Sequence, residues 1–388
     1  MKSAAEFAQG WPVVLGGFVG TFFSVGTLVI YSFGLFAPEF SKAFGWSRGE
    51  LGLALTVFNY TIILSGIAYG IAIDRFGPRL VILLSTALFA LSYASLATVA
   101  GNKLHFYAVF ALMAIMGGGT LPVSYSRLIV SWFDGKRGMA LGLALVGTGV
   151  GAAVLPPFIQ WLIDDYGWET ATLVLAGGIA LIALPASFLL LRPMPNSSAS
   201  PAKESARLPL NRAFWVLAIF SLLSGLFLIG AIIHFVSILQ DRGLSPQKAA
   251  RFASLIGVSV IIGRLAVGYV LDRVFAPRVV FVLYLAPVAA FLVLREASSD
   301  AAFLGAALAF GLAQGAEIDI IAFLVSRYFP RAAFGVTYSV LFSAFTVGAG
   351  ASSHTRASRR LPYAEHVKSP AVQDGRVPRG LGVPGRTH

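Results

Sequence analysis

The chain has 388 residues, of which 57% are apolar and only 12% are charged. A soluble domain carries about 25% charged residues, so this composition excludes water as the main solvent of the fold. The net charge of +12 comes without a basic helix or a basic and aromatic stripe, which argues against a nucleic-acid partner. The chain contains no cysteine, which excludes disulfides and thiolate metal sites. No metal or cofactor is predicted.

Apolar runs recur along most of the chain, and a bilayer core about 30 Å thick needs about 20 such residues per helix. The first ten residues lack the cationic start and cleavage pattern of a signal peptide, so the first run is expected to remain as a span. The pattern predicts eleven spanning helices, at residues 11–33, 49–71, 79–100, 106–131, 138–160, 169–191, 213–238, 249–271, 278–294, 301–327 and 332–350.

The longest polar connection, residues 192–212, is rich in Pro, Ser and charge, which is typical of a linker. It divides the chain into a six-helix bundle at 1–191 and a five-helix bundle at 213–350, followed by a polar basic tail at 351–388. With a cytoplasmic N-terminus, thirteen Lys and Arg lie inside and seven outside, which favours this orientation. We expect a monomeric multi-pass protein of the inner or plasma membrane.

The two halves share a repeated loop. A shift of 198 residues lays Ser47 on Ser245 and Gly70 on Gly268, and brings GIAIDRFGPR (70–79) onto GYVLDRVFAPR (268–278). Each stretch joins the second and third helices of its half. Six helices per repeat give both halves the same orientation, and transporters built from such parallel repeats bind solute between the halves near the midplane.

The first stretch meets the pattern G-x-x-x-D-R-x-G-x-R, and on this loop the chain resembles the major facilitator superfamily over residues 11–350. Pro78 departs from the pattern, and the second copy has one extra residue. The resemblance implies an all-α membrane fold of two pseudo-symmetric six-helix bundles, here with the twelfth helix missing. It also implies that the loop aspartates and arginines contact neighbouring helix ends and hold a cytoplasmic gate shut, whereas an ordinary basic turn is the alternative. The predicted gating residues are Gly70, Asp74, Arg75, Gly77, Arg79, Gly268, Asp272 and Arg273.

Ionisable residues inside spans are candidates for function because they are costly in the bilayer. Arg264 lies roughly 12 Å inside the eighth helix, too deep to reach the surface easily. Its planar guanidinium suits a carboxylate, so we expect it to bind an organic anion; a structural pair with an acid of the tenth helix is the alternative. Arg127 is a second candidate for the substrate site, although it could extend to the interface.

Glu317 and Asp319 of the tenth helix lie two residues apart, so they point about 200° apart and cannot face one cavity equally. We expect one of them to carry a coupling proton and the other to pair with Arg264 or Arg127. His234 of the seventh helix is the next candidate for coupling, with a structural histidine as the alternative. Polar residues of the first two helices that could line the cavity are Tyr31, Asn59 and Tyr60.

Within the superfamily, YSFGLFAPEF (31–40), FGWSRGELG (44–52), the arginine of the eighth helix and the acids of the tenth resemble the oxalate:formate antiporter and monocarboxylate porter branch. That antiporter has a lysine in its eleventh helix for a second carboxylate, whereas the span after Arg331 has none. The resemblance therefore implies transport of a monocarboxylate with protons or by exchange. The alternatives are efflux of amphipathic compounds, which the glycine-rich fifth helix suggests, and a transport-inactive sensor. No nucleophile elbow, zinc motif or phosphate loop supports an enzyme.

The last 38 residues differ from the rest of the chain. Residues 351–388 hold seven of the 29 Lys and Arg, are rich in Arg, Pro, Gly, Ala and Ser, and have no run able to cross a bilayer. This composition is expected of GC-rich coding DNA read out of frame, which leads to the hypothesis of a reading-frame change near residue 350. A genuine disordered tail on an eleven-helix protein is the alternative.

Overall fold

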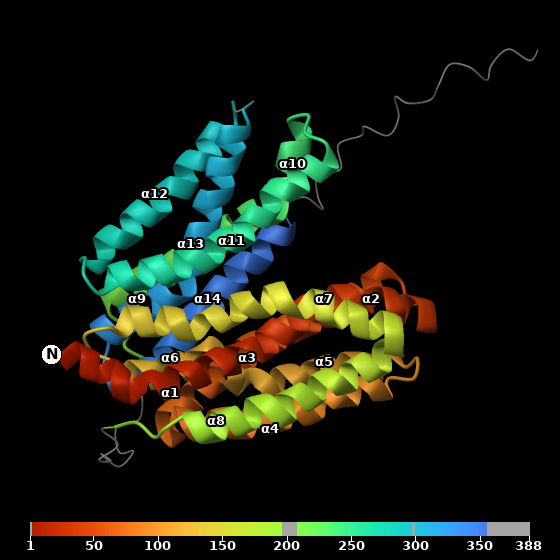
Figure 1. The fold of residues 1–388 in the computed structure, drawn as a ribbon, viewed down its shortest axis with the longest axis horizontal. Coiled ribbons are helices and arrows are strands. Elements are labelled where there is room, and N and C mark those ends of the chain that lie inside the picture. Colours follow the sequence, from red (N-terminus) through yellow and green to blue (C-terminus); the bar gives the residue numbers. More distant parts are fainter. Residues whose placement is uncertain (1, 196–207, 297–298, 355–388) are drawn as a thin grey trace, which may run out of the picture.

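The computed structural model describes residues 2–195, 208–296 and 299–354, and every regular element within these ranges is helical (Figure 1). The predictions for the middle of the linker and for nearly all of the tail fall outside the described residues. The all-α class predicted from the apolar runs is confirmed.

The helices follow one another with short connections, several of them single 3-10 or π turns. The first half of the chain forms α1 (Lys2–Phe22), α2 (Val25–Phe44), α3 (Arg48–Phe76), α4 (Pro78–Ala94), α5 (Lys103–Gly117), α6 (Pro122–Trp132), α7 (Arg137–Gly178) and α8 (Leu184–Leu190). The second half forms α9 (Arg212–Ser224), α10 (Gly230–Asp241), α11 (Pro246–Leu271), α12 (Ala276–Leu294), α13 (Asp300–Tyr328) and α14 (Phe334–His354).

Ten stretches of the described residues are long and apolar enough to cross a membrane. The stretch Arg137–Leu190 has 54 residues, which at 1.5 Å per residue is roughly twice the length that one crossing needs. Gly167 interrupts it with a φ of 82° and a ψ of 164°, and the chain turns back there (Figure 1). This stretch therefore crosses twice, which gives eleven spans, the number that the sequence predicts. The first of them is longer than predicted, because α1 and α2 together form a stretch from Glu6 to Phe44 instead of 11–33.

Matching serines begin the second helix of each half. Ser47 accepts a hydrogen bond from the backbone N–H of Glu50, whose carboxylate bonds back to the Ser47 N–H at 2.9 Å, a complete capping box. Ser245 accepts the equivalent bond from the Lys248 N–H at 3.3 Å. Two residues that are 198 positions apart, Ser47 and Ser245, therefore cap equivalent helices, α3 and α11, in the two halves.

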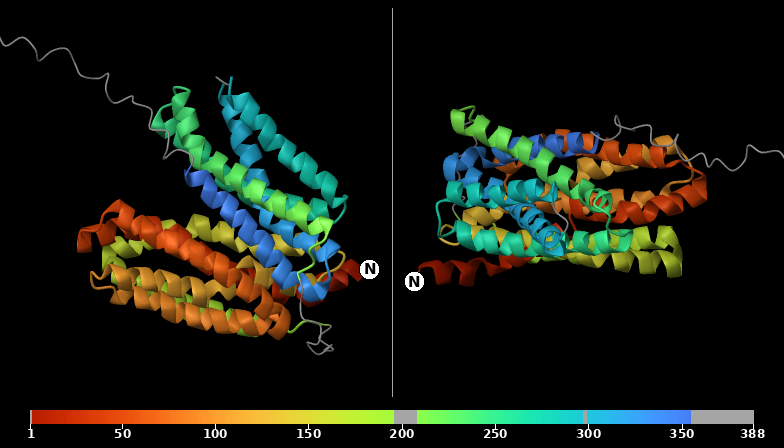
Figure 2. Two further views of the ribbon diagram at one scale, coloured as in Figure 1. Left: turned by 180° about the vertical axis from the view of Figure 1, so that it is seen from behind. Right: turned by 90° about the horizontal axis from the view of Figure 1, so that it is seen from above.

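The two halves meet along α7 against α11 and α3 against α14, at the end of the molecule where residues 195 and 208 lie; we call this the linker end (Figures 1 and 2). Glycines allow this approach. A Cβ on Gly70 would lie 2.6 Å from the carbonyl oxygen of Gly335, and one on Gly268 would lie 2.5 Å from that of Gly138. Toward the opposite end the ribbons of the halves spread apart (Figure 1). The packing thus closes the linker end.

Candidate functional site

Arg264 of α11 is 4% exposed and connects the two halves of the molecule. Its Nε donates to the Gly315 carbonyl of α13 at 3.0 Å, in its own half. Its Nη1 donates to the carbonyl of Leu145 and to the hydroxyl of Thr148, both on α7 in the other half. Nη2 makes no hydrogen bond to any described residue. One arm of the guanidinium thus retains donors for a ligand.

Asp319 of α13 faces Arg264 from the second half. Its Oδ2 lies 3.5 Å from the Arg264 Nε, and neither carboxylate oxygen accepts a hydrogen bond within the described part of the chain. The side chain is 1% exposed, so water does not compensate it. A buried carboxylate needs a close partner, and at 3.5 Å this ion pair is a loose one.

Two tyrosines lie near this pair. Tyr31 of α2 is close enough to Arg264 to lie within the field of its charge, and 41% of the residue is exposed. Tyr338 of α14 is fully buried and lies within the field of Asp319 and Arg264. The Arg264 guanidinium is therefore surrounded by two phenols and one carboxylate. Its positive charge and the phenol O–H donors suit the binding of a small anion.

Glu317 does not share this site. It is fully buried and accepts a hydrogen bond from the hydroxyl of Ser224 at the end of α9, while its Oε2 has no partner among the described residues. Tyr284 of α12 lies beside the same pair. The two acids of α13 thus face different neighbours, as their spacing predicts, and only Asp319 reaches Arg264.

At the linker end each half inserts a carboxylate against the start of a helix in the other half. Asp74 accepts hydrogen bonds from the backbone N–H groups of Gly335 and Val336, both at 2.9 Å. Asp272 accepts them from Gly138 at 2.6 Å and Met139 at 2.9 Å. The first N–H groups of a helix lack partners within it and carry partial positive charge, so both contacts are charge-assisted.

The two copies of this contact differ in their surroundings. Arg127 of α6 lies 3.7 Å from Asp74 through its Nε, and its guanidinium stands 5.7 Å from the ring of Phe334. The structure thus connects Arg127 to the linker end, and its part in substrate binding stays a prediction. Asp272 is partly buried, and this burial raises the pKa of its carboxyl above the ordinary value although the hydrogen bonds from Met139 and Gly138 lower it.

The remaining predicted gating residues stabilise the loop within their own halves. Arg79 donates from Nη2 to the carbonyl of Phe188 at 3.1 Å, at the end of α8. Arg75 stacks 5.1 Å from the ring of Phe76, and Arg273 stacks 3.4 Å from that of Tyr269. Gly77 has a φ of 83°, a conformation that side chains disfavour. Among the charged residues of the two repeated loops, the aspartates make the hydrogen bonds that the structure shows to the opposite half.

Three predicted residues lie apart from the Arg264 pair. Asn59 and Tyr60 are exposed on α3, and no contact connects them to Arg264 in the described ranges. His234 of α10 is half-buried, and its Nε2 has no hydrogen-bond partner among the described residues. Their roles stay predictions.

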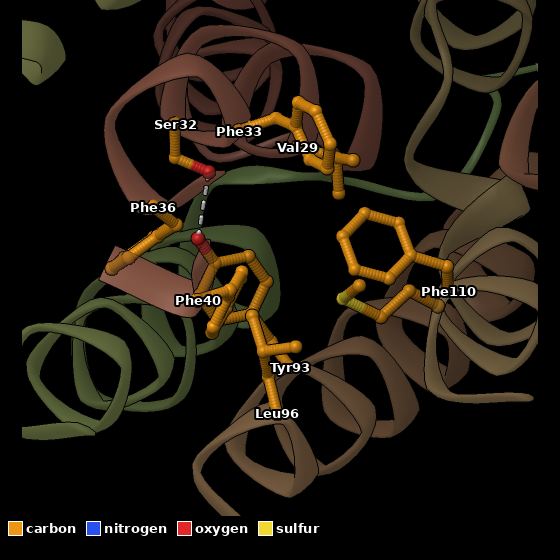
Figure 3. Close-up of a pocket in the computed structure, with 9 residues that line it drawn as sticks. Val29, Ser32, Phe33, Phe36, Phe40, Tyr93, Leu96 and Phe110 are labelled. Carbon is orange, nitrogen blue, oxygen red and sulfur yellow. Dashed lines mark hydrogen bonds between the residues drawn. The ribbon is translucent and has the colours of Figure 1, made fainter. Parts of the chain in front are cut away.

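A small cavity inside the first half is lined by nine residues, four of which are phenylalanines of α2 and α5 (Figure 3). Ser32 and Tyr93 share a hydrogen bond of 3.0 Å at its wall. Its volume of about 10 Å³ holds at most one water molecule. This cavity is therefore too small for an organic solute.

Sequence reasoning missed the groups that receive the predicted charges. These are Leu145, Thr148 and Gly315 around Arg264, Ser224 beside Glu317, and the helix starts at Gly138 and Gly335. Only the helix starts carry a signal, because KRGMA (136–140) and RAAFGVT (331–337) each place a glycine shortly after a basic residue at a helix start. Backbone carbonyls leave no mark in the sequence.

Eleven apolar spans in two halves, packed together at one end and with the buried Arg264 reaching from one half to the other, have the architecture of a membrane transporter. The sequence model of the Major Facilitator Superfamily matches residues 17–353, which is most of the chain. The chain belongs to this superfamily of secondary transporters and is not an enzyme.

Several known proteins are similar to the chain. Monocarboxylate transporter 13 of Rattus norvegicus is 30% identical over 283 residues, which cover 69% of this chain and 62% of that protein. The agnestins efflux protein AgnL12 of Paecilomyces divaricatus is 25% identical over 368 residues, covering 90% and 81%. The chain thus spans less than two thirds of the rat protein. The transporter FucP in an outward conformation has a TM-score of 0.71 at 17% identity, covering 89% of this chain and 91% of FucP, which shows the shared fold.

Proposed function

We propose that the protein moves a small monocarboxylate across the cell membrane by alternating access, coupled to protons, with its linker end in the cytoplasm. The observation that carries this proposal is the Arg264 guanidinium, which is buried where the halves meet and whose Nη2 makes no hydrogen bond to the part of the chain that the structure describes. The 30% identity to a monocarboxylate transporter supports the substrate class. The division into bundles at 1–191 and 213–350 belongs to the same proposal.

The coupling follows from the loose ion pair. A substrate carboxylate that bonds to the Arg264 guanidinium competes with Asp319 for the same charge. Asp319, 1% exposed, would then be a buried carboxylate without a cation, and binding a proton is the least costly way to neutralise it. The substrate anion and one proton thus enter together. Glu317 and His234 are the remaining candidates for coupling.

A second function has an observation in its favour. The fungal efflux protein AgnL12 resembles 90% of the chain, more than the rat transporter does, which supports efflux of larger organic compounds as an alternative. Uptake and efflux use the same fold, so the substrate distinguishes them. A sensor without transport is the third alternative.

The experiment is uptake of labelled lactate, pyruvate, formate and oxalate by purified protein in liposomes, with and without an inward pH gradient. We expect saturable uptake of one or more monocarboxylates, faster with the gradient, and little oxalate uptake. Uptake of none of them would contradict the proposal. Binding without flux would then identify a sensor.

A further inference from the structure

A cavity of about 460 Å³ lies at the linker end, outside the site described for the substrate. Its walls come from both halves. Asp134 and Arg137 lie just before α7 and at its first residue, Asp272 and Arg273 directly follow α11, and Arg327 lies in the last turn of α13. Cavities that bind small molecules have volumes of about 300–1,000 Å³. This one has the size of a ligand site.

The charges on its walls are unbalanced. Arg137 already donates hydrogen bonds to the Asp134 carboxylate, at 2.6 Å, and to the Ser326 hydroxyl. Asp134 also forms an ion pair with Arg331 at 3.3 Å. The Asp272 carboxylate already accepts hydrogen bonds from the first N–H groups of α7. With Arg331 included, four arginines thus stand against two carboxylates, so the cavity carries an excess of two positive charges.

Two of the arginines remain available. Arg327 makes no hydrogen bond or ion pair with any described residue, and it lies near enough to Arg137 for the two charges to repel. Arg273 uses only Nη1, on the Tyr269 carbonyl of its own helix at 3.0 Å. The N–H groups of these two arginines that no described residue accepts offer donors that match the oxygens of a phosphate group.

We propose that this cavity binds an organic phosphate, held by Arg273 and Arg327, and that this ligand stabilises the closed linker end. The volume exceeds the needs of a free phosphate ion, which favours a phosphate joined to a small polar group. A soluble phosphate monoester and a lipid headgroup share this chemistry. The cavity exists only while Arg137 of the first half faces Arg273 and Arg327 of the second, so a ligand in it binds the closed state better than the open one.

The test measures the distance between spin labels at the linker end and does not depend on transport. The chain has no cysteine, so Leu80→Cys on α4 and Phe281→Cys on α12 give two unique labelling positions on opposite halves, 50% and 69% exposed and outside the cavity. Glycerol 3-phosphate is titrated against glycerol at equal ionic strength. A parallel arm compares nanodiscs of phosphatidylcholine with and without phosphatidylglycerol.

We expect one arm to shift the population toward the short distance. Arg327→Gln and Arg273→Gln should each raise the half-maximal concentration about tenfold, as expected for a lost charge-assisted contact. Arg251→Gln, which removes a charge from the far end of α11, should leave the shift unchanged. A shift with glycerol 3-phosphate identifies a soluble ligand, and one with phosphatidylglycerol alone identifies a lipid headgroup. No shift in either arm, or a shift that survives both cavity variants, would overturn the proposal.

Discussion

The linker end and the Arg264 site both join the two halves through charges, but they satisfy those charges differently. Asp74 and Asp272 each accept two backbone hydrogen bonds of 2.6–2.9 Å from helix starts. Within the described ranges, Asp319 accepts no hydrogen bond and forms a 3.5 Å ion pair with Arg264, whose Nη2 makes no hydrogen bond there. A fully bonded polar group stabilises one conformation, whereas a partly bonded one gains from a ligand. We therefore propose that the linker end serves closure and that the Arg264 site serves recognition.

The largest expected effect comes from Arg264→Ala. Truncating one partner of a buried charge pair costs about 2–5 kcal/mol of binding free energy, so pyruvate should bind at least about 30-fold more weakly. Arg264→Lys should restore part of the affinity. Arg251→Ala, on the exposed start of the same helix, is the matched control. Titration calorimetry measures all three, and unchanged affinity in the Arg264→Ala variant would remove this residue from the site.

Asp319→Asn should separate binding from coupling. The variant keeps the shape of the site but cannot take up a proton, so exchange of bound anion should persist. A one-unit pH gradient gives about tenfold accumulation when one proton moves with each anion, and this accumulation should vanish. Glu317→Gln is the matched variant on the same helix and should retain accumulation. The reverse result would transfer coupling to the Ser224 and Glu317 pair.

Gly70→Ala should open the linker end. The added Cβ would lie 2.6 Å from the Gly335 carbonyl oxygen of the other half, and such overpacking costs about 1–3 kcal/mol. Gly66→Ala on the same helix meets nothing within 4 Å and is the control. Spin-label distances across the linker end should lengthen for the first variant only. Equal behaviour of the two variants would contradict the closed packing.

The smallest effect should distinguish the two aspartates. Asp74→Asn and Asp272→Asn each weaken two backbone contacts, at a cost of about 1–3 kcal/mol. The Asp74 variant also leaves the buried Arg127 without its carboxylate, so it should lower the closed population more. The same distance measurement ranks them. A larger effect for Asp272→Asn would show that Arg127 is not held by Asp74.

Sequence predicted the helical class, the eleven spans and the repeated loop because apolar length and motif spacing are local properties. It also predicted that Glu317 and Asp319 face different neighbours, since helix geometry fixes their angle. It could not select which acid meets Arg264, because that depends on how α11 packs against α13. The bonds from Arg264 to Leu145 and Gly315 use backbone carbonyls, which every residue has.

Proton coupling through Arg264 and Asp319 is tested most directly by counting the protons taken up when pyruvate binds to the purified protein in weakly buffered solution. If the anion takes Arg264 from Asp319, about one proton should be bound per pyruvate. Asp319→Asn should bind pyruvate with no proton uptake, and Arg264→Ala should show neither binding nor proton uptake at pyruvate concentrations that saturate the unaltered protein. Pyruvate binding to the unaltered protein without any proton uptake would contradict the coupling through this pair.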